Sequence, residues 1–262
     1  MPADDLEWDD CLASRRREVT VQRTRFTLIH QEKLAPKTYR MVLSGDTSAI
    51  TAPGQFVNIA LEGKFLRRPI SVCDWKEGEL TILYKVVGQG TEQMSRMVPG
   101  IVLDILTGLG NGYDLAKSGD KPLLIGGGAG IPPMYALAKA LLAQGKHPQV
   151  ILGFNQASEQ FFLREFKDLG VDVTVTTVDG SLGVKGFVTD AMTGEYTYVY
   201  TCGPLPMLKA IDGKALTSGQ FSFEERMGCG FGACMGCTCQ TKYGNKRICR
   251  EGPVLEREEI IW

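Results

Sequence analysis

The sequence contains no uninterrupted apolar run that approaches the roughly 18 residues of a membrane-spanning helix, so we expect no membrane partner. It also lacks an excess of positive charge, because 29 Lys and Arg residues are balanced by 30 Asp and Glu residues. This balance argues against a protein that binds nucleic acid through bulk electrostatics. Histidine is scarce as well: His30 and His147 lie outside every motif described below, and both are expected at the surface.

The first 18 residues lack the hydrophobic core of a secretory signal or a membrane anchor. We therefore expect residues 1–18 to form an N-terminal extension, and the protein to work in the reducing cytoplasm. The rest of the composition is ordinary for a globular protein, with 44% hydrophobic and 23% charged residues. A chain of 262 residues is long enough for two domains or more.

Cysteine, in contrast, is concentrated near the C-terminus, in Cys229-Gly-Phe-Gly-Ala-Cys234-Met-Gly-Cys237-Thr-Cys239 and at Cys249. The spacing C-x4-C-x2-C followed by a remote cysteine is the plant-type pattern for a [2Fe-2S] cluster. Thiolates are soft ligands that suit iron, and a tight loop brings three of them to one point. The interleaved glycines let backbone N–H groups approach the cluster. The pattern therefore predicts an iron–sulfur site.

Two other uses of these cysteines deserve comparison. A structural zinc site also uses C-x2-C, but zinc ribbons present two separate knuckles, and this chain has one C-x2-C that overlaps a C-x4-C. A disulfide framework requires an oxidising compartment and is usual in small secreted domains. The fourth ligand is either Cys239 or Cys249, and the remote position of the plant-type pattern favours Cys249.

The first half of the chain, from residue 19, consists of short apolar or alternating runs separated by Gly and Pro. Six strands at regular spacing predict a small antiparallel barrel. The expected strands are Val19–Phe26, Thr38–Leu43, Gln55–Ala60, Pro69–Asp74, Glu79–Val86 and Ile101–Leu106.

Two segments of the predicted barrel have the chemistry of a diphosphate site. The run Arg68-Pro69-Ile70-Ser71 combines a guanidinium, which pairs bidentately with phosphate, with a hydroxyl. A Gly-rich turn with Gly90 and Thr91 follows the strand that ends in Leu83-Tyr84-Lys85. We expect Thr91 to cap a helix over Glu92–Met97, whose free N–H groups would attract phosphate.

The second half alternates strands with helices, which predicts a doubly wound parallel sheet. We expect strands at Pro122–Gly126, Val150–Phe154, Val171–Thr177 and Tyr198–Cys202, and helices from the glycine turn to about Ala143, over Gln160–Leu169 and over Phe187–Met192.

A glycine-rich turn, Gly126-Gly127-Gly128-Ala129-Gly130, joins the first of these strands to a helix that opens with two prolines. Such a turn lets the diphosphate of a dinucleotide approach the helix N-terminus. The last strand ends in Cys202-Gly203, at the edge of the sheet where ligands bind. After the second strand, residues 153–159 contain no cation that would hold a 2′-phosphate, which favours NADH over NADPH.

These motifs together resemble those of the ferredoxin reductase superfamily. More closely, residues 19–262 resemble the electron-transfer subunits of the NAD-dependent (type B) dihydroorotate dehydrogenases. The resemblance is carried by Arg68-Pro69-Ile70-Ser71, Leu83-Tyr84-Lys85, Gly90-Thr91, Gly108-Leu-Gly-Asn-Gly112, Glu225-Arg-Met-Gly-Cys229 and Cys249-Arg-Glu-Gly-Pro253. The longer N-terminus and the additional Cys239 depart from the family pattern.

The resemblance implies an α+β multidomain protein with three cofactor sites. It implies FAD contacts from residues 68–71, 83–85, Gly90 and Thr91 in an antiparallel β-barrel domain, residues 19–118. NAD would contact Gly127, Gly128, Gly130, Cys202 and Gly203 in a doubly wound α/β domain, residues 119–218. A small [2Fe-2S] domain, residues 219–262, would use Cys229, Cys234, Cys237 and Cys249 as ligands.

By the same resemblance, the chain would pass electrons between NAD and an FMN-containing subunit that oxidises dihydroorotate, in pyrimidine biosynthesis. Two copies of each subunit are expected. The alternative is the reductase subunit of a cytoplasmic NAD(P)H:ferredoxin or sulfide-linked complex, which shares nearly all of these motifs. No acid–base pair is needed for electron transfer, so no catalytic side chain is predicted.

Overall fold

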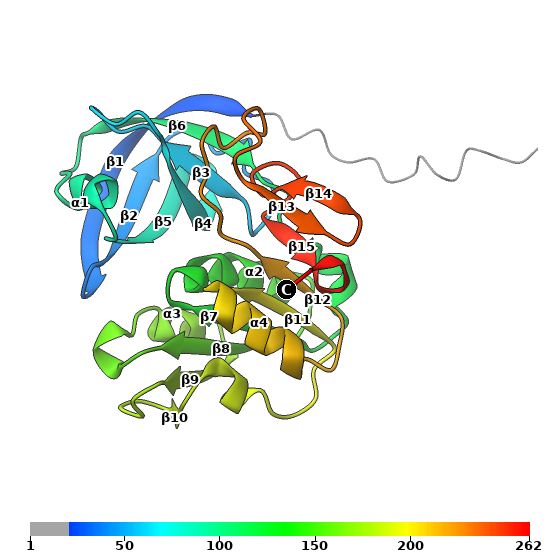
Figure 1. Cartoon of the computed structure of the whole chain (residues 1–262). Coiled ribbons are helices and arrows are strands. Elements are labelled where there is room, and N and C mark those ends of the chain that lie inside the picture. The colour runs from blue at the N-terminus through cyan, green and yellow to red at the C-terminus, as the bar shows by residue number, and fades with distance from the viewer. Residues whose placement is uncertain (1–20) are drawn as a thin grey trace, which may run out of the picture.

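The computed structural model describes residues 21–262 (Figure 1). The expected N-terminal extension, residues 1–18, and the first two residues of the expected first strand lie outside the described residues. Within residues 21–262, no helix combines the length and the apolar composition that crossing a bilayer requires. His30 and His147 are both exposed, as predicted.

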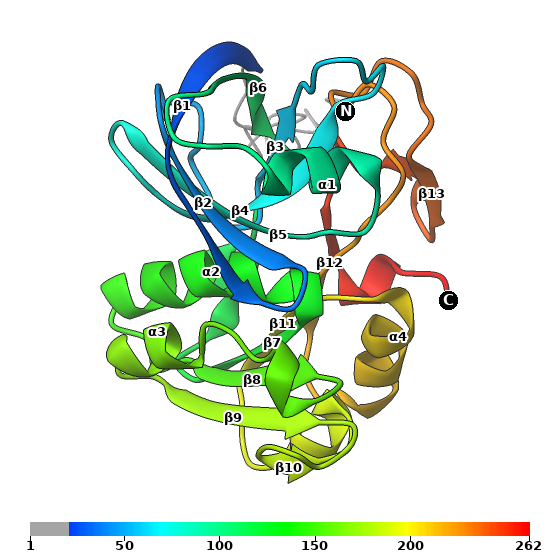
Figure 2. The same ribbon diagram turned by 90° about the vertical axis from the view of Figure 1, so that its left-hand side faces the viewer.

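The N-terminal half folds into a closed antiparallel barrel of six strands, which confirms the predicted architecture. Its strand order is β1-β2-β5-β4-β3-β6. The strands are β1 Gln22–Ala35, β2 Thr38–Ser44, β3 Phe56–Ile59, β4 Arg68–Lys76, β5 Glu79–Lys85 and β6 Val102–Leu109. Apolar side chains of all six strands, among them Phe26, Ile82 and Ile105, fill the interior and are fully buried. A short helix, α1 (Gln89–Ser95), follows β5 and lies beside the barrel (Figure 2).

The second half contains a seven-stranded sheet in the order β10-β9-β8-β7-β11-β12-β15, in which only β15 is antiparallel to its neighbour. The strands are β7 Pro122–Gly127, β8 Gln149–Phe154, β9 Asp172–Thr177, β10 Val184–Lys185, β11 Tyr198–Cys202, β12 Gly219–Ser222 and β15 Val254–Glu256. The helices are α2 Ile131–Ala143, α3 Leu163–Asp168 and α4 Leu205–Lys214. Side chains of α2 and α3 belong to one core of the sheet and those of α4 to a second one. The predicted doubly wound sheet is therefore confirmed.

Several local details differ from the sequence-based expectations. The segment expected as a helix over Phe187–Met192 contains only a 3-10 turn, η5 (Val188–Ala191). The other 3-10 turns are η2 Leu115–Ser118, η3 Gly128–Gly130, η4 Ala157–Glu159 and η6 Arg257–Glu259. The strands β12 and β15 were not predicted, because each has only three or four residues and too little pattern to recognise.

The C-terminal segment is tied to both halves of the molecule (Figure 1). Its cysteine loop is followed by a two-stranded hairpin, β13 (Thr238–Thr241) with β14 (Gly244–Arg247). The chain then returns as β15, which pairs with β12 at the edge of the seven-stranded sheet. Both β12 and β15 belong to residues 219–262, so the sheet extends into the segment predicted as a cluster domain. The domain limits themselves remain a prediction.

The barrel strand β3 faces two different environments, because successive side chains of a strand point to opposite faces. Val57 and Ile59 are buried in the barrel core. Phe56, in contrast, belongs to a buried group that includes Cys237 and Cys249. Strand β3 is thus the structural link between the barrel and the C-terminal cysteines.

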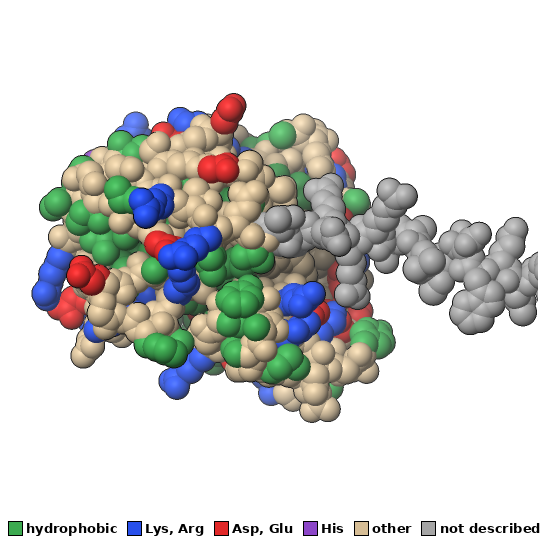
Figure 3. Space-filling view, turned by 90° about the horizontal axis from the view of Figure 1, so that it is seen from above, with side chains coloured by type: hydrophobic (Ala, Val, Ile, Leu, Met, Phe, Trp, Pro, Cys, Tyr) green, Lys and Arg blue, Asp and Glu red, His purple; other side chains and the backbone are tan. Residues whose placement is uncertain are grey.

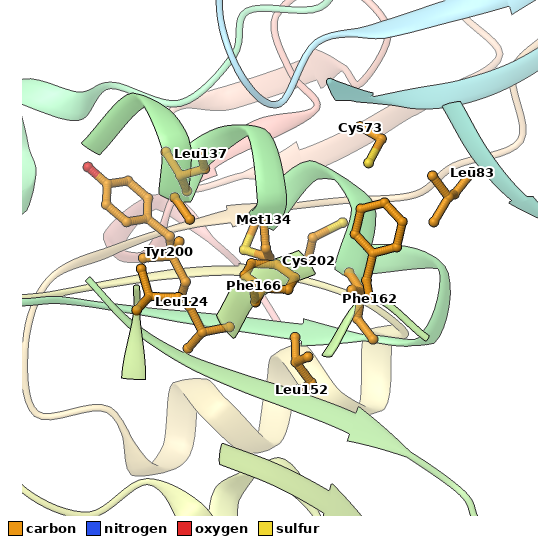
Figure 4. Close-up of a cluster of buried hydrophobic side chains, with 14 of the residues drawn as sticks. Cys73, Leu83, Leu124, Met134, Leu137, Leu152, Phe162, Phe166, Tyr200 and Cys202 are labelled. Atoms are coloured by element: carbon orange, nitrogen blue, oxygen red, sulfur yellow. The ribbon is translucent and has the colours of Figure 1, made fainter. Parts of the chain in front are cut away.

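The strands β4 and β5 provide the contact with the seven-stranded sheet. Cys73 and Leu83 are buried in the same core as Leu137 of α2 and Phe162 (Figure 4). Lys139 of α2 also forms an ion pair of 2.6 Å with Asp74 of β4. Barrel and sheet therefore share one apolar interface, which fixes the geometry of any site between them.

Candidate functional site

The four cysteines of the predicted cluster lie in two pairs. The backbone N–H of Cys234 donates to the Cys229 sulfur at 3.4 Å, and the N–H of Cys229 donates to the Cys234 sulfur at 3.4 Å. The N–H of Cys249 donates to the Cys237 sulfur at 3.4 Å. A [2Fe-2S] cluster is held by four thiolates, and these four cysteines would supply that number as two pairs.

Backbone N–H groups converge on the sulfur of Cys229. Burial disfavours its thiolate, but N–H groups of Cys234, Phe231 and Ala233 outweigh this effect and lower the pKa of Cys229. Burial and the neighbouring Cys237 raise the pKa of Cys249. The Cys229 side of the loop therefore stabilises a thiolate, which is the form that binds metals.

The rest of the loop fits an inorganic cluster in its chemistry. Gly230 and Gly232 have φ of +80° and +93°, a conformation that glycine adopts without strain. A side chain at Gly228 would lie 3.1 Å from the Cys234 sulfur, so glycine keeps that sulfur accessible. In residues 21–262, no three His, Cys, Asp or Glu side chains gather around one point as for a single metal ion.

The remaining cysteine of the loop, Cys239, has a different environment. It lies on β13 opposite Lys246 and is half-buried. Within the described part of the chain no hydrogen bond joins it to another cysteine, whereas Cys249 is joined to Cys237. All seven cysteines of residues 21–262 are free thiols, so no disulfide framework is present there.

Arg68, at the start of β4, donates a hydrogen bond to the Leu66 carbonyl but forms no ion pair in the described residues. Its neighbour Arg67 pairs with Asp104 at 2.8 Å, but no carboxylate in residues 21–262 lies within ion-pair distance of Arg68. The Arg68 guanidinium lies against Gly90 of α1, where a side chain on residue 90 would approach its Nε to 2.1 Å. Gly90 therefore creates the space that Arg68 occupies, and a guanidinium without a carboxylate partner there fits a diphosphate.

Thr91 does not have the role expected for it. Gly88 caps α1, and Thr91 is the third residue of the helix. The Thr91 hydroxyl accepts hydrogen bonds from the N–H groups of Val87 and Gly88, at 3.0 and 3.3 Å. The prediction of Thr91 as the cap was wrong, because the helix begins earlier than expected, with Gly88 at the cap and Gly90 inside its first turn. Its hydroxyl instead stabilises the turn that carries Gly90 beside Arg68.

A narrow cleft opens between the barrel and the seven-stranded sheet. One wall carries the end of β5, and the other carries the tip of the glycine turn. The lining residues are Thr38, Leu83, Tyr84, Lys85, Gly128, Ala129, Pro132, Phe154, Glu159 and Phe161. Segments predicted separately for FAD and for NAD therefore meet in one cleft.

The other residues predicted for NAD lie beside this cleft and are closely packed. A side chain at Gly130 would approach the Cys202 carbonyl to 2.1 Å, and one at Gly127 would approach the Met207 sulfur to 2.4 Å. Gly203 also lies against Met207. The glycine turn and the end of β11 are thus in direct contact, with Gly128 as the accessible glycine.

Cys202 is 1% exposed, at the carboxyl end of β11. Burial raises the pKa of its thiol to about 12, and the negative charge of Glu224 contributes to the rise. The side chain is therefore a neutral thiol. In an apolar pocket it acts as a small hydrophobic surface rather than as a nucleophile.

Two contacts of the site could not be predicted from the sequence. Lys85 of the barrel and Glu159 of the sheet domain approach to 3.8 Å across the cleft, and no motif described above singles out Glu159. Asn58 of β3 donates to the Cys229 carbonyl at 3.2 Å. No motif marks Asn58, because the contact joins residues 171 positions apart.

Comparison with known proteins places this architecture in a class. Residues 124–213 match the family described as the oxidoreductase NAD-binding domain, and residues 224–261 match the iron-sulfur cluster binding domain of dihydroorotate dehydrogenase B. A solved structure of an NADH-dependent reduced ferredoxin-NADP oxidoreductase is 31% identical with a TM-score of 0.83, and the similarity covers 90% of each chain. A ferredoxin NADP+ reductase from Neisseria gonorrhoeae with bound FAD and NADP, 17% identical, has a TM-score of 0.64 over 74% of this chain and 89% of that one. The chain is thus an electron-transfer oxidoreductase of the ferredoxin reductase fold.

The curated relatives narrow this class. The electron transfer subunit of dihydroorotate dehydrogenase B (NAD(+)) from Bacillus mycoides (strain KBAB4) is 40% identical over 258 residues, which cover 92% of this chain and 99% of the relative. The subunit of the same name from Bacillus cereus (strain B4264) matches equally well. The chain belongs to the family of dihydroorotate dehydrogenase B electron transfer subunits. Its cofactors are a [2Fe-2S] cluster, FAD and NAD, and it acts with a catalytic partner subunit.

Proposed function

We propose that this chain carries electrons between NADH and an FMN-containing subunit that oxidises dihydroorotate, in a complex with two copies of each subunit. The observation that supports this most directly is the position of β3 and β4. Strand β4 carries residues proposed for FAD, and its neighbour β3 contacts the cysteine segment through Phe56 and Asn58. The cofactors supply the redox chemistry, because a flavin exchanges electrons in pairs or singly and a cluster exchanges one at a time.

The register of the two strands supports adjacent flavin and cluster sites. Ser71 of β4 lies opposite Phe56, and Pro69 lies opposite Asn58. Residues directly opposite each other in an antiparallel pair project from the same face. Phe56 contacts the group that includes Cys237 and Cys249, so Ser71 and Pro69 project from the barrel face that carries the cysteines.

In the proposed FAD site, Arg68 holds the diphosphate and Gly90 leaves room for its guanidinium. Pro69, Ile70 and Ser71, with Leu83, Tyr84, Lys85 and Thr91, complete the contacts. In the proposed NAD site, Gly128 approaches the diphosphate, while Gly127, Gly130, Cys202 and Gly203 form the closely packed wall. Cys229, Cys234, Cys237 and Cys249 ligate the cluster, since these four form the two pairs.

The face around the cysteine loop is proposed to bind the catalytic partner. Phe231 and Met235 are 45% and 55% exposed, and Cys234 between them is exposed as well. Phe65, in the loop before β4, is fully exposed. Seen from the barrel side, hydrophobic side chains lie exposed among charged ones (Figure 3). An exposed apolar surface next to an electron-transfer centre suits contact with a second protein.

A second candidate function is electron transfer to a ferredoxin-type partner. The 31% identical NADH-dependent reduced ferredoxin-NADP oxidoreductase favours it, because the similarity covers 90% of both chains. The dihydroorotate dehydrogenase B subunits are 40% identical over 92% of the chain. The higher identity makes the dihydroorotate-linked function the main proposal.

The test is reconstitution with the catalytic subunit. The purified chain, loaded with FAD and cluster, should oxidise NADH with artificial acceptors and be inert toward dihydroorotate. Addition of the FMN subunit should give a complex on gel filtration and NAD-linked dihydroorotate oxidation. Turnover of dihydroorotate by the isolated chain, or no complex at micromolar concentration, would contradict the proposal and favour the ferredoxin-linked function.

A further inference from the structure

Asn58 is a polar residue in an unusual position. It lies on the buried strand β3 and is 1% exposed, although asparagine is mostly found at protein surfaces. Its Nδ2 donates to the Cys229 carbonyl at 3.2 Å. Its Oδ1 is buried and has no hydrogen-bond partner. A buried acceptor without a donor destabilises the folded protein, so stability alone does not explain this side chain.

The cysteine loop is shaped to receive this side chain. Gly230, which follows the carbonyl that Asn58 binds, has φ +80° and lies so close that a Cβ there would be 2.2 Å from the Asn58 Nδ2. The Asn58 carboxamide therefore packs directly against the loop backbone. In residues 21–262 no other side chain of the six barrel strands donates a hydrogen bond to residues 228–237.

Asn58 is fixed from the other side by Arg67, the residue directly before the flavin motif. Its backbone carbonyl accepts from Arg67 at 3.3 Å, and Arg67 pairs in turn with Asp104 of β6. Asn58 lies opposite Pro69 in the register of β3 with β4. Asn58 is thus held rigidly next to the proposed flavin residues, and its side chain in turn holds the backbone of Cys229, the first cysteine of the loop.

We propose that Asn58 is a positioning residue that holds the Cys229 end of the cluster loop at a fixed place relative to the flavin strand. This inference rests on the proposed function and concerns the residues of this chain that set the flavin–cluster geometry. The hydrogen bond fixes the Cys229 carbonyl, and with it the N–H groups that converge on the Cys229 sulfur. Hydrogen bonds to the sulfurs are among the factors that set a cluster's reduction potential.

The main test is Asn58→Leu, which removes both polar atoms and keeps the branched shape of the side chain. Loss of the unpaired Oδ1 stabilises the folded protein, whereas loss of the donor to the Cys229 carbonyl destabilises it, so the melting temperature should change little. Amide exchange of residues 228–236 in the FAD- and cluster-loaded protein should become about fivefold faster or more, as expected for the loss of one hydrogen bond. The reduction potential of the cluster should fall, and cluster reduction after NADH addition should slow while flavin reduction does not.

Thr107→Val provides a matched control. Thr107, on β6, is fully buried, and its hydroxyl has no partner either. The substitution removes an unpaired buried polar atom without touching the cysteine loop. Loop exchange, cluster potential and transfer rate should all stay at wild-type values, which would separate positioning from a general effect of barrel polarity.

Gly230→Ala tests the same contact from the loop. In the wild-type background the new methyl group collides with Asn58, whereas in the Asn58→Ala background that space is free and only the backbone strain remains. Gly230→Ala should therefore change the cluster spectrum less in the Asn58→Ala background. Equal effects in both backgrounds would contradict direct contact.

The outcomes separate this inference from the proposed function. A wild-type chain whose cluster is not reduced by NADH would overturn the proposed electron path. A wild-type chain that transfers electrons normally, with Asn58→Leu indistinguishable in loop exchange and cluster potential, would overturn the role of Asn58 alone.

Discussion

The barrel and the cysteine loop are stabilised in different ways. The barrel contains fifteen buried apolar side chains in one core, several of them fully buried. In residues 228–236, by contrast, the only buried residues are Gly230 and Gly232. Apolar burial at roughly 25 cal/mol per Å² can fold the barrel, but it cannot fold the loop. The loop must depend on its N–H···S hydrogen bonds, on Asn58 and on the cluster, since metal binding contributes folding free energy in such segments.

The strongest test of this difference is Cys237→Ser. Cys237 is 2% exposed and its sulfur is joined to Cys249, so we expect complete loss of the cluster's visible absorption. FAD should stay bound, because its proposed residues belong to the barrel. Absorption spectra and iron analysis measure both effects.

Cys239→Ser is the matched control and should retain full iron. Full iron in Cys249→Ser together with loss of iron in Cys239→Ser would reverse the choice of the fourth ligand. Loss of FAD in Cys237→Ser would show that the loop and the barrel do not fold independently.

A substitution in the barrel core should affect both FAD and the cluster, whereas Cys237→Ser should affect the cluster alone. Ile82 is fully buried in β5, and Ile82→Ala should lower the free energy of unfolding by about 2–5 kcal/mol through lost burial and a cavity. FAD and the cluster should then be lost together on heating, because the loop is anchored on β3. Thermal unfolding followed by flavin fluorescence and cluster absorption tests this.

Val98→Ala serves as the control for the core substitution. Val98 is 60% exposed, and exposed substitutions usually change stability by less than about 0.5 kcal/mol. A cluster signal that survives after the barrel of Ile82→Ala has melted would contradict the dependence of the loop on β3.

Within the barrel, Arg68→Ala should affect FAD and leave the fold intact. Its guanidinium has no carboxylate partner in the described residues, and a charge-assisted hydrogen bond contributes about 1.5–3 kcal/mol. We expect FAD retention to weaken about tenfold to a hundredfold. Flavin content after gel filtration measures this.

Arg96→Ala is the comparison for Arg68→Ala, since Arg96 is an exposed arginine of the same barrel domain that pairs with Glu92. It should keep its FAD. Full flavin content in Arg68→Ala would remove Arg68 from the diphosphate site.

The smallest change in stability is expected when an ion pair of the barrel is removed. A hydrogen bond from Arg23 lowers the pKa of Asp104. Burial acts in the opposite direction, and Arg67 adds to the lowering. A carboxyl with a lowered folded-state pKa stabilises the protein above its unfolded pKa, and this contribution is lost as pH falls through the folded pKa. Asp104→Asn should be slightly less stable than wild type at neutral pH, and the difference should shrink in acid. Melting temperatures of both proteins at pH 7 and pH 3 test this, and a difference that grows in acid would contradict the sign.

Much of the architecture was predictable from local sequence. The alternation of short apolar runs gave the six barrel strands, and strand–helix alternation gave the core of the parallel sheet. The prediction failed for short elements. The strands β12 and β15 have too few residues to show a pattern, and the segment at Val188–Ala191 forms only a 3-10 turn. Thr91 was misplaced because the glycine-rich sequence does not show that α1 begins directly after Gly88.

The sequence by itself determined which chemical groups are present: thiols at the spacing of a [2Fe-2S] loop, an arginine and a glycine-rich turn for phosphate, and a second glycine-rich turn for a dinucleotide. Spacing along the chain is local, so it can be read without a fold. Only the tertiary structure decided which groups meet, because strand order and register join residues far apart in the sequence. Arg68 lies against Gly90, Cys249 joins Cys237, and Asn58 reaches Cys229 across 171 positions. These contacts arise from closing the barrel and seating the loop on β3, which no local pattern encodes.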